Sequence, residues 1–148
     1  MTDWKASIDQ WRARHAVRTL RALSRPVVER ASADLGSFPT DLLELYLCTN
    51  GLSKDAFVIF SIADDSDPKR TWNSVQRANR QGQTEVLVGY ETDVTSRFLV
   101  IGQVAYERGA LVERSTGALW FEDDEKLVHT NHSLEPFIDA CLRDIDCA

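Results

Sequence analysis

The segment Phe38-Pro39-Thr40-Asp41-Leu42-Leu43-Glu44-Leu45-Tyr46-Leu47-Cys48-Thr49-Asn50-Gly51 carries the clearest structural signal in the chain. Pro39 suits the first turn of a helix, where a missing N–H costs nothing. The apolar residues that follow at helical spacing are Leu42, Leu43, Tyr46 and Leu47. Asn50-Gly51 tolerates the left-handed backbone that often ends a helix. The segment therefore predicts a short amphipathic helix.

Residues 1–35, which precede this helix, predict a helical region. One stripe of residues at helical spacing contains Trp4, Ile8, Trp11 and His15. A second stripe continues it with Leu20, Leu23, Val27 and Ala31. Pro26 breaks or kinks this run, or begins a new helix near Arg25, because proline cannot donate the hydrogen bond that a helix interior needs.

The chain after Gly51 alternates between short apolar runs and turn residues, a pattern typical of strands. The runs that predict strands are 56–60, 85–90, 97–101, 110–114, 118–122 and 126–130. Residues 64–68 predict a loop, whereas Trp72, Val75 and Ala78 have the spacing of a helix over 71–81. Residues 115–117 and 123–125 are short enough for hairpin turns.

The last part of the chain predicts a helix that begins near Ser133, whose hydroxyl can cap it. Its apolar stripe consists of Leu134, Phe137, Ile138, Cys141, Leu142 and Ile145. Helices followed by strands and a closing helix indicate one α+β domain over residues 1–148. We expect N-terminal helices over 1–35, then over 36–148 a helix, a mostly antiparallel sheet of about five to six strands, and a C-terminal helix packed on that sheet.

The composition is that of a globular protein. The 148 residues are 43% hydrophobic and 27% charged, and no apolar stretch approaches the length of a membrane span. The first residues are polar, so a signal peptide is not expected. The cysteines are odd in number and lack a metal-binding spacing: Cys48, Cys141 and Cys147. These features predict reduced thiols in a cytoplasmic protein.

Charge is distributed unevenly along the chain. Residues 1–35 have a net charge of +3 and the remaining residues one of −9, which gives −6 overall. An acidic body repels the nucleic acid backbone and favours a basic protein partner. The alternative is that the acidic surface only keeps the protein soluble. We expect a protein partner, with no nucleic acid and no membrane.

The sequence contains no recognisable catalytic arrangement. It lacks a Gly-rich phosphate loop, a Gly-x-Ser-x-Gly turn and a His-Glu-x-x-His motif. His129 and His132 are three residues apart near several acids, but no third metal ligand is placed by spacing. Cys141 and His15 lie on apolar stripes, where packing is the expected role. We therefore expect no catalytic residue, no metal and no cofactor.

The segment from Phe38 to Gly51 resembles the hydrophobic-Pro-x-Asp … Asn-Gly signature of the SUKH superfamily, the bacterial relatives of the yeast Smi/Knr cell-wall assembly regulators. The strand Phe98-Leu99-Val100-Ile101-Gly102 is similar to a family strand that ends in glycine. The segment from Asn131 to Phe137 is similar to the family's Asn-x-Ser-hydrophobic-x-x-Phe entry to the last helix. The resemblance covers residues 38–142 and leaves the N-terminal helix unmatched.

The resemblance implies an immunity protein. Many bacterial members of the superfamily bind and neutralise a cognate polymorphic toxin, often a nuclease or deaminase, by occluding its active site. Two acidic clusters are the candidate contact residues, with an aromatic anchor in the second: Asp64, Asp65, Asp67, Trp120, Glu122, Asp123, Asp124 and Glu125. The alternative for the clusters is that turns are polar because they face water.

Two further functions remain open from the sequence. The same fold could serve as a non-enzymatic regulatory or scaffold module that binds a cellular protein. A small metal-dependent hydrolase is the third interpretation, and it would need the histidines and acids to converge. The oligomeric state is left open.

Overall fold

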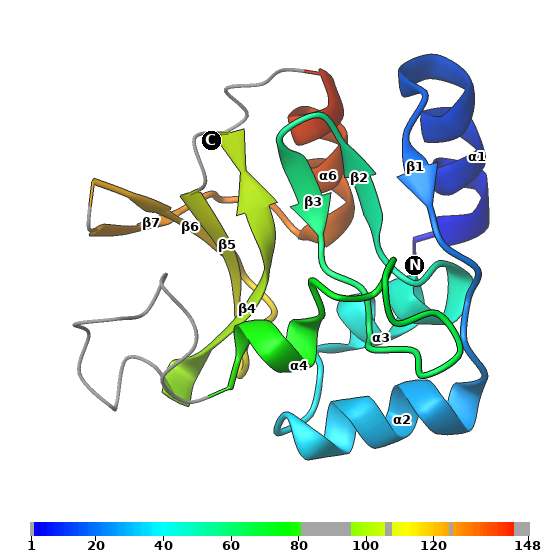
Figure 1. The fold of residues 1–148 in the computed structure, drawn as a ribbon. Coiled ribbons are helices and arrows are strands. Elements are labelled where there is room, and N and C mark those ends of the chain that lie inside the picture. Colours follow the sequence, from blue (N-terminus) through cyan, green and yellow to red (C-terminus); the bar gives the residue numbers. More distant parts are fainter. Residues whose placement is uncertain (1, 81–95, 106–107, 125, 144–148) are drawn as a thin grey trace.

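The sheet is a meander, because strands that are neighbours in the sheet are also consecutive in the chain (Figure 1). The computed structural model describes residues 2–80, 96–105, 108–124 and 126–143. The strands are β1 (Arg18–Thr19), β2 (Leu52–Lys54), β3 (Phe57–Ile59), β4 (Phe98–Val104), β5 (Arg108–Glu113), β6 (Leu119–Asp123) and β7 (Lys126–His129). The helices are α1 (Trp4–His15), α2 (Arg25–Asp34), α3 (Thr40–Cys48), α4 (Val75–Ala78) and α6 (Leu134–Arg143).

The predicted α+β fold is confirmed, and every pairing between neighbouring strands is antiparallel. Within the described residues the sheet has seven strands, more than the five to six expected. The additional strands β1 and β2 contain two and three residues, too few to show an alternating pattern in the sequence. The strand expected over 85–90 lies outside the described residues.

The N-terminal region departs from the expected run of helix. Ala16 adopts a left-handed φ of 52° and ends α1, after which Arg18 pairs with Ser53 in the sheet. Pro26 lies in the first turn of α2, so this helix begins anew with its own phase. As a result Val28 is fully buried, whereas Val27, which the predicted stripe contained, is 44% exposed.

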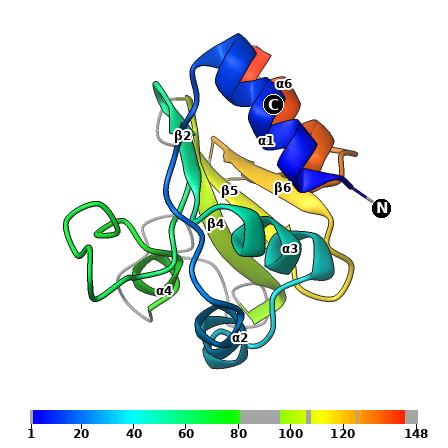
Figure 2. The same cartoon turned by 90° about the vertical axis from the view of Figure 1, so that its right-hand side faces the viewer.

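Helices cover the two faces of the sheet unequally. Figure 2 shows α1, α3 and α6 on one face, and α4 with the segment before it on the other. Helix α1 packs along α6, and α2 packs against α3 at the end of the molecule. Trp4 and Trp11 of the predicted α1 stripe are buried, and the Trp11 Nε1 donates a hydrogen bond to Asp139 Oδ1 at 3.1 Å.

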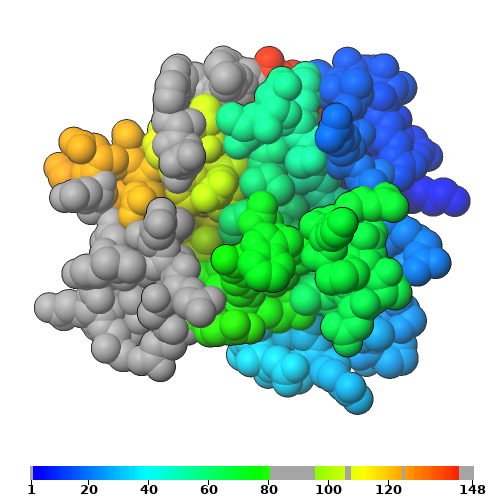
Figure 3. Space-filling view, viewed as in Figure 1, coloured from blue at the N-terminus to red at the C-terminus, as the bar shows by residue number. Residues whose placement is uncertain are grey.

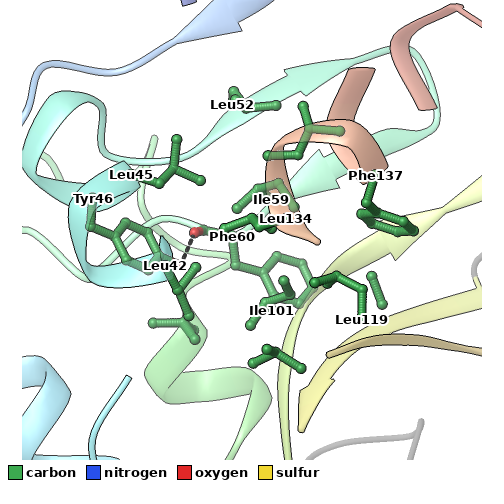
Figure 4. Packing of buried hydrophobic residues seen from close by; sticks show 14 of the residues in the cluster. Leu42, Leu45, Tyr46, Leu52, Ile59, Phe60, Ile101, Leu119, Leu134 and Phe137 are labelled. Carbon is green, nitrogen blue, oxygen red and sulfur yellow. Dashed lines mark hydrogen bonds between the residues drawn. The ribbon is translucent and has the colours of Figure 1, made fainter. Parts of the chain in front are cut away.

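The core lies between the sheet and the helices α1, α3 and α6, and Figure 4 shows part of it. The rings of Phe57 on β3 and Phe137 on α6 meet edge to face at 6.4 Å. The described part of the predicted α6 stripe is buried: Leu134, Phe137, Ile138, Cys141 and Leu142. Ile145 lies outside the described residues. Burial of each such side chain contributes roughly 1.5–3 kcal/mol, so α6 closes the domain by packing.

The segment predicted as a helix forms α3 with one change in its buried face. Leu42, Leu45 and Tyr46 are buried, whereas Leu43 and Leu47 are only partly buried. The Tyr46 hydroxyl donates a 2.6 Å hydrogen bond to the carbonyl of Phe60, so the helix is joined to the chain that leaves β3 (Figure 4).

The cysteines do not all match the expectation of reduced thiols. Cys48 is a free, exposed thiol whose pKa is raised mainly by desolvation. Cys141, in contrast, is disulfide-bonded. Within the described parts of the chain, none of the helices combines the length and apolar character that crossing a lipid bilayer requires.

Candidate functional site

The first acidic cluster consists of Asp64, Asp65 and Asp67. It lies on the loop that leads from β3 to α4, on the face of the sheet opposite α1, α3 and α6 (Figure 2). The loop has internal order. The Asp64 carboxylate accepts hydrogen bonds from the backbone N–H and the hydroxyl of Ser66, at 3.0 and 2.7 Å. The Thr71 hydroxyl accepts from the Asp64 N–H at 3.0 Å and donates to the Asp67 carbonyl at 2.8 Å. These hydrogen bonds give the loop a defined conformation.

The bonds from Ser66 also fix the charge of Asp64. The pKa of this carboxyl is lowered, first by the hydrogen bond from the Ser66 hydroxyl and then by the bond from the Ser66 backbone N–H. Both bonds favour the ionised form. Asp64 is therefore a carboxylate at neutral pH.

Charges of both signs lie on this loop and on the helix that follows it. Asp67 forms a salt bridge with Arg70 at 3.2 Å, and Arg77 and Arg80 follow within α4 and just beyond it. The first cluster is thus not a uniformly negative patch. Arginine and tryptophan, both present here, are enriched at protein interfaces.

Trp72 is the most prominent side chain of this surface. It is 64% exposed, more than the other large apolar side chains exposed in the described structure, Val27 and Val128. The guanidinium carbon of Arg77 lies 4.1 Å from the centroid of the Trp72 ring. This stacking holds the indole in place while its other face meets solvent. We call the surface formed by Asp64, Asp65, Trp72, Arg77 and Arg80 the Trp72 surface.

The helix predicted over 71–81 is wrong at its start, and this error hid Trp72. Helix α4 begins at Val75, with the Ser74 hydroxyl accepting a 3.0 Å hydrogen bond from the Arg77 N–H as its cap. Ser74 was the signal that could have placed the helix start correctly, since serine is a preferred N-cap. Trp72 then lies before the helix. The predicted end, Gln81, is outside the described residues.

A cavity of about 330 Å³ opens in the Trp72 surface. Its lining comes from the loop and from α4, and includes Asp64, Asp65, Thr71, Trp72, Arg77 and Arg80. In Figure 3 these segments, coloured green, occupy the lower centre and right of the face that is turned to the viewer. The other side of the loop borders a second cavity of about 370 Å³, lined by Arg18, Arg70 and Asn73 among others.

The second acidic cluster lies on the hairpin that joins β6 and β7. Asp123 is 3.9 Å from Arg108 Nη1 with its side chain 56% exposed, and Asp124 is exposed with a left-handed φ of 52°. Glu122 lies opposite Leu127 in the β6–β7 ladder, and Glu125 is outside the described residues. In Figure 1 the hairpin lies at the left of the molecule and the green loop lies at the lower right. The structure therefore does not bring the two clusters together.

Trp120 is half-buried and packs against its neighbours in the sheet. Its ring meets Phe98 at 5.4 Å and His129 at 4.9 Å, both edge to face, and its Nε1 donates to Glu113 Oε1 at 3.3 Å. Leu119 and Phe121, its neighbours along β6, are buried, and Leu119 lies in the core beside Phe137 of α6 (Figure 4). Trp120 therefore belongs to the opposite face, because successive side chains of a strand point to opposite sides of the sheet.

The two histidines considered for a metal border a shallow cavity of about 640 Å³. His129 Nδ1 accepts from the Asn131 N–H at 3.0 Å, and His132 is exposed. Arg114, which lines the same cavity, donates to the Leu35 carbonyl. Among the described residues, no group of three or more His, Cys, Asp or Glu side chains could hold a metal ion.

Comparisons of the chain with models of protein families, with curated proteins and with solved structures give no match.

Proposed function

We propose that this chain is a non-catalytic protein-binding module that acts as an immunity protein, neutralising a bacterial toxin domain by covering its active site in the cytoplasm of the producing cell. The observation that carries the proposal is the exposure of Trp72 beside the stacked Arg77. Tryptophan and arginine are the residues on which protein interfaces most often depend for affinity. The resemblance of residues 38–142 to the SUKH superfamily supplies the toxin as the partner.

Electrostatics supports a basic partner at longer range. Residues 36–148 have a net charge of −9, and the β6–β7 hairpin presents Asp123 and Asp124 to solvent. Toxins that cleave or modify nucleic acid usually need a basic groove for their substrate, which an acidic protein attracts. We assign steering to the hairpin and affinity to the Trp72 surface, since exposed charges act mainly on the association rate.

The test is co-expression of the chain with the protein encoded directly upstream of its gene, which we expect to be the toxin. Wild type is expected to restore growth and to form a one-to-one complex. Trp72→Ala is expected to weaken the complex by at least about 2 kcal/mol, the usual threshold for an interface anchor. Val27→Ala is the matched control, because Val27 is also exposed but lies on α2 and is not part of the Trp72 surface.

The outcomes separate the candidate functions. Loss of protection in Trp72→Ala with retention in Val27→Ala supports the immunity function at this surface. An isolated gene, and no toxicity that the chain relieves, would favour a regulatory or scaffold module instead. Turnover of a substrate by the purified chain would favour an enzyme.

The disulfide at Cys141 is the feature that argues for an oxidising compartment. Thiol labelling of the chain taken directly from cells tests the cytoplasmic assignment separately. Cys141 is buried, so the cells are lysed in denaturant together with the thiol reagent. Labelling of Cys141 in the unfolded chain is expected if the protein acts in the cytoplasm, and resistance to labelling until a reductant is added would place it in an oxidising compartment.

A further inference from the structure

The cavity in the Trp72 surface contains two arginines that have no carboxylate partner among the described residues. Arg77 and Arg80 both line it, three residues apart, and neither takes part in a salt bridge there. Two like charges that line the same small cavity repel each other. An anion between them would remove that repulsion.

Arg77 is the more strongly under-satisfied of the two. Its Nη1 is buried and has no hydrogen-bond acceptor within the described structure. Its guanidinium also stacks on Trp72 at 4.1 Å, which attracts the cation but supplies no acceptor. The Arg77 guanidinium is thus desolvated on one side and has no counter-ion. Binding of a negatively charged acceptor on its open side would therefore be favourable in free energy.

The acids of the same surface do not serve as that acceptor. Asp64 accepts both Ser66 hydrogen bonds on Oδ1 and forms no salt bridge with Arg77 or Arg80 in the described structure, and Asp67 is paired with Arg70. Asp65 is exposed at the rim of the cavity. The cavity thus has a cationic wall, formed by Arg77 and Arg80, and an acidic rim.

We propose that this cavity receives the carboxylate of an aspartate or glutamate side chain of the partner protein, held by Arg77 and Arg80 beside the ring of Trp72. The inference rests on the proposed function, because it names the chemistry of the partner at the same surface. Stacking on Trp72 fixes the plane of the Arg77 guanidinium, which favours a two-point bond to a planar carboxylate. The acidic rim suits a basic side chain next to the inserted acid, so the partner presents an acidic residue within a basic patch.

The probe is N-acetyl-glutamate N-methylamide, which reproduces an acidic side chain within a polypeptide. N-acetyl-glutamine N-methylamide is the neutral control of the same shape. Each is titrated into the ¹⁵N-labelled full chain, and the indole N–H of Trp72 is followed, assigned from its loss in Trp72→Phe. Saturable shifts are expected for the glutamate probe, with an affinity about tenfold or more above that of the glutamine probe.

Variants tie the binding to the arginines. Arg77→Gln is expected to lower the affinity for the glutamate probe about tenfold. Asp65→Asn is expected to raise it, because a repelling charge is removed from the rim. Arg30→Gln, on the exposed side of α2, is the control and should bind as wild type does. The dispersion of each spectrum reports whether the variant is folded, and Arg77→Lys replaces Arg77→Gln if the latter unfolds.

Equal affinity for the two probes, or unchanged binding in a folded Arg77 variant, would overturn the inference. If the probes fail while Trp72→Ala still abolishes protection from the toxin, the carboxylate site is wrong and the immunity function stands. If the glutamate probe binds as expected while the chain neutralises no toxin, the site stands and the proposed function is wrong.

Discussion

The side-chain amide of Asn50 forms two hydrogen bonds with the backbone of Ile62: its Oδ1 accepts from the Ile62 N–H at 2.7 Å, and its Nδ2 donates to the Ile62 carbonyl at 2.9 Å. Asn79 repeats this arrangement with Val100, at 2.8 and 2.7 Å. The loop that carries Trp72 lies between Ile62 and Asn79. Both of its ends are therefore fixed to the body of the protein by asparagine side chains.

Replacing Asn50 with alanine is expected to destabilise the whole domain. Asn50 is 2% exposed, so Asn50→Ala would leave the N–H and carbonyl of Ile62 buried without partners. The expected loss is about 1–3 kcal/mol for each unsatisfied group, measured as the free energy of unfolding in urea. Asn73 is an exposed residue of the same loop, so Asn73→Ala should be as stable as wild type. Equal stability of Asn50→Ala and Asn73→Ala would show that the Asn50 hydrogen bonds do not stabilise the fold.

Alkaline pH is expected to destabilise the protein through Tyr46. Complete burial raises the pKa of the Tyr46 hydroxyl far above its usual 10.0, so the folded state keeps the proton that the unfolded state releases. Stability from this difference is fully present below pH 10 and is lost as the pH rises further, because only the unfolded chain gains by ionising.

Urea unfolding of wild type and Tyr46→Phe between pH 8 and pH 11 checks this prediction. Tyr46→Phe also removes the bond to the Phe60 carbonyl, which should cost about 1–3 kcal/mol at neutral pH. The difference between the two proteins should therefore shrink above about pH 10. A constant difference across the range would show that another group causes the alkaline transition.

Gly102→Ala is expected to disrupt the sheet. The Cβ of an alanine at this position would lie 2.0 Å from the carbonyl oxygen of Val58 on the neighbouring strand β3, and backbone atoms cannot easily give way. Gly102 also follows a register shift between β4 and β5 at Val100, where the chains are closely fitted. We expect a loss above about 3 kcal/mol, or failure to fold, by thermal unfolding.

Gly117→Ala provides the comparison for that variant. Its new Cβ would meet only Pro39 at an ordinary 3.6 Å, and the cost comes from the left-handed φ of 76°. That conformation costs roughly 1–2 kcal/mol for an alanine. Equal stability of the two glycine variants would show that contact with Val58 is relieved by movement of the strands.

Charge reversal on the β6–β7 hairpin is expected to slow association with the toxin. Asp123→Lys with Asp124→Lys changes two exposed charges, so the association rate should fall about tenfold at low salt while dissociation changes little. Stopped-flow mixing with the toxin at two salt concentrations measures both effects, and the circular dichroism spectrum should match that of wild type. An unchanged rate at both salt concentrations would remove the hairpin from the interface and leave the Trp72 surface as the candidate.

Periodic patterns in the sequence predicted the elements that are long enough to show them. The stripes of α1 and α6 and the position of α3 follow from residues that repeat at helical spacing, and strands β3 to β7 follow from short apolar runs bounded by turn residues. Strands β1 and β2 escaped prediction because two or three residues acquire strand geometry only through their partners. Val27 was assigned to the wrong face because Pro26 restarts the helix with a different phase.

For the candidate site, too, some features follow from the sequence and others only from the tertiary structure. The amino-acid sequence by itself determined the α+β fold, the acidic loop and the acidic hairpin, because local hydrophobic spacing and turn chemistry act over a few residues. Only the tertiary structure decided that Trp72 is exposed and that Trp120 is half-buried, that the two acidic clusters lie apart, and that Arg77 stacks on Trp72. The exposure of a side chain depends on which distant segments of the chain cover it. Those contacts form only when the whole domain packs together.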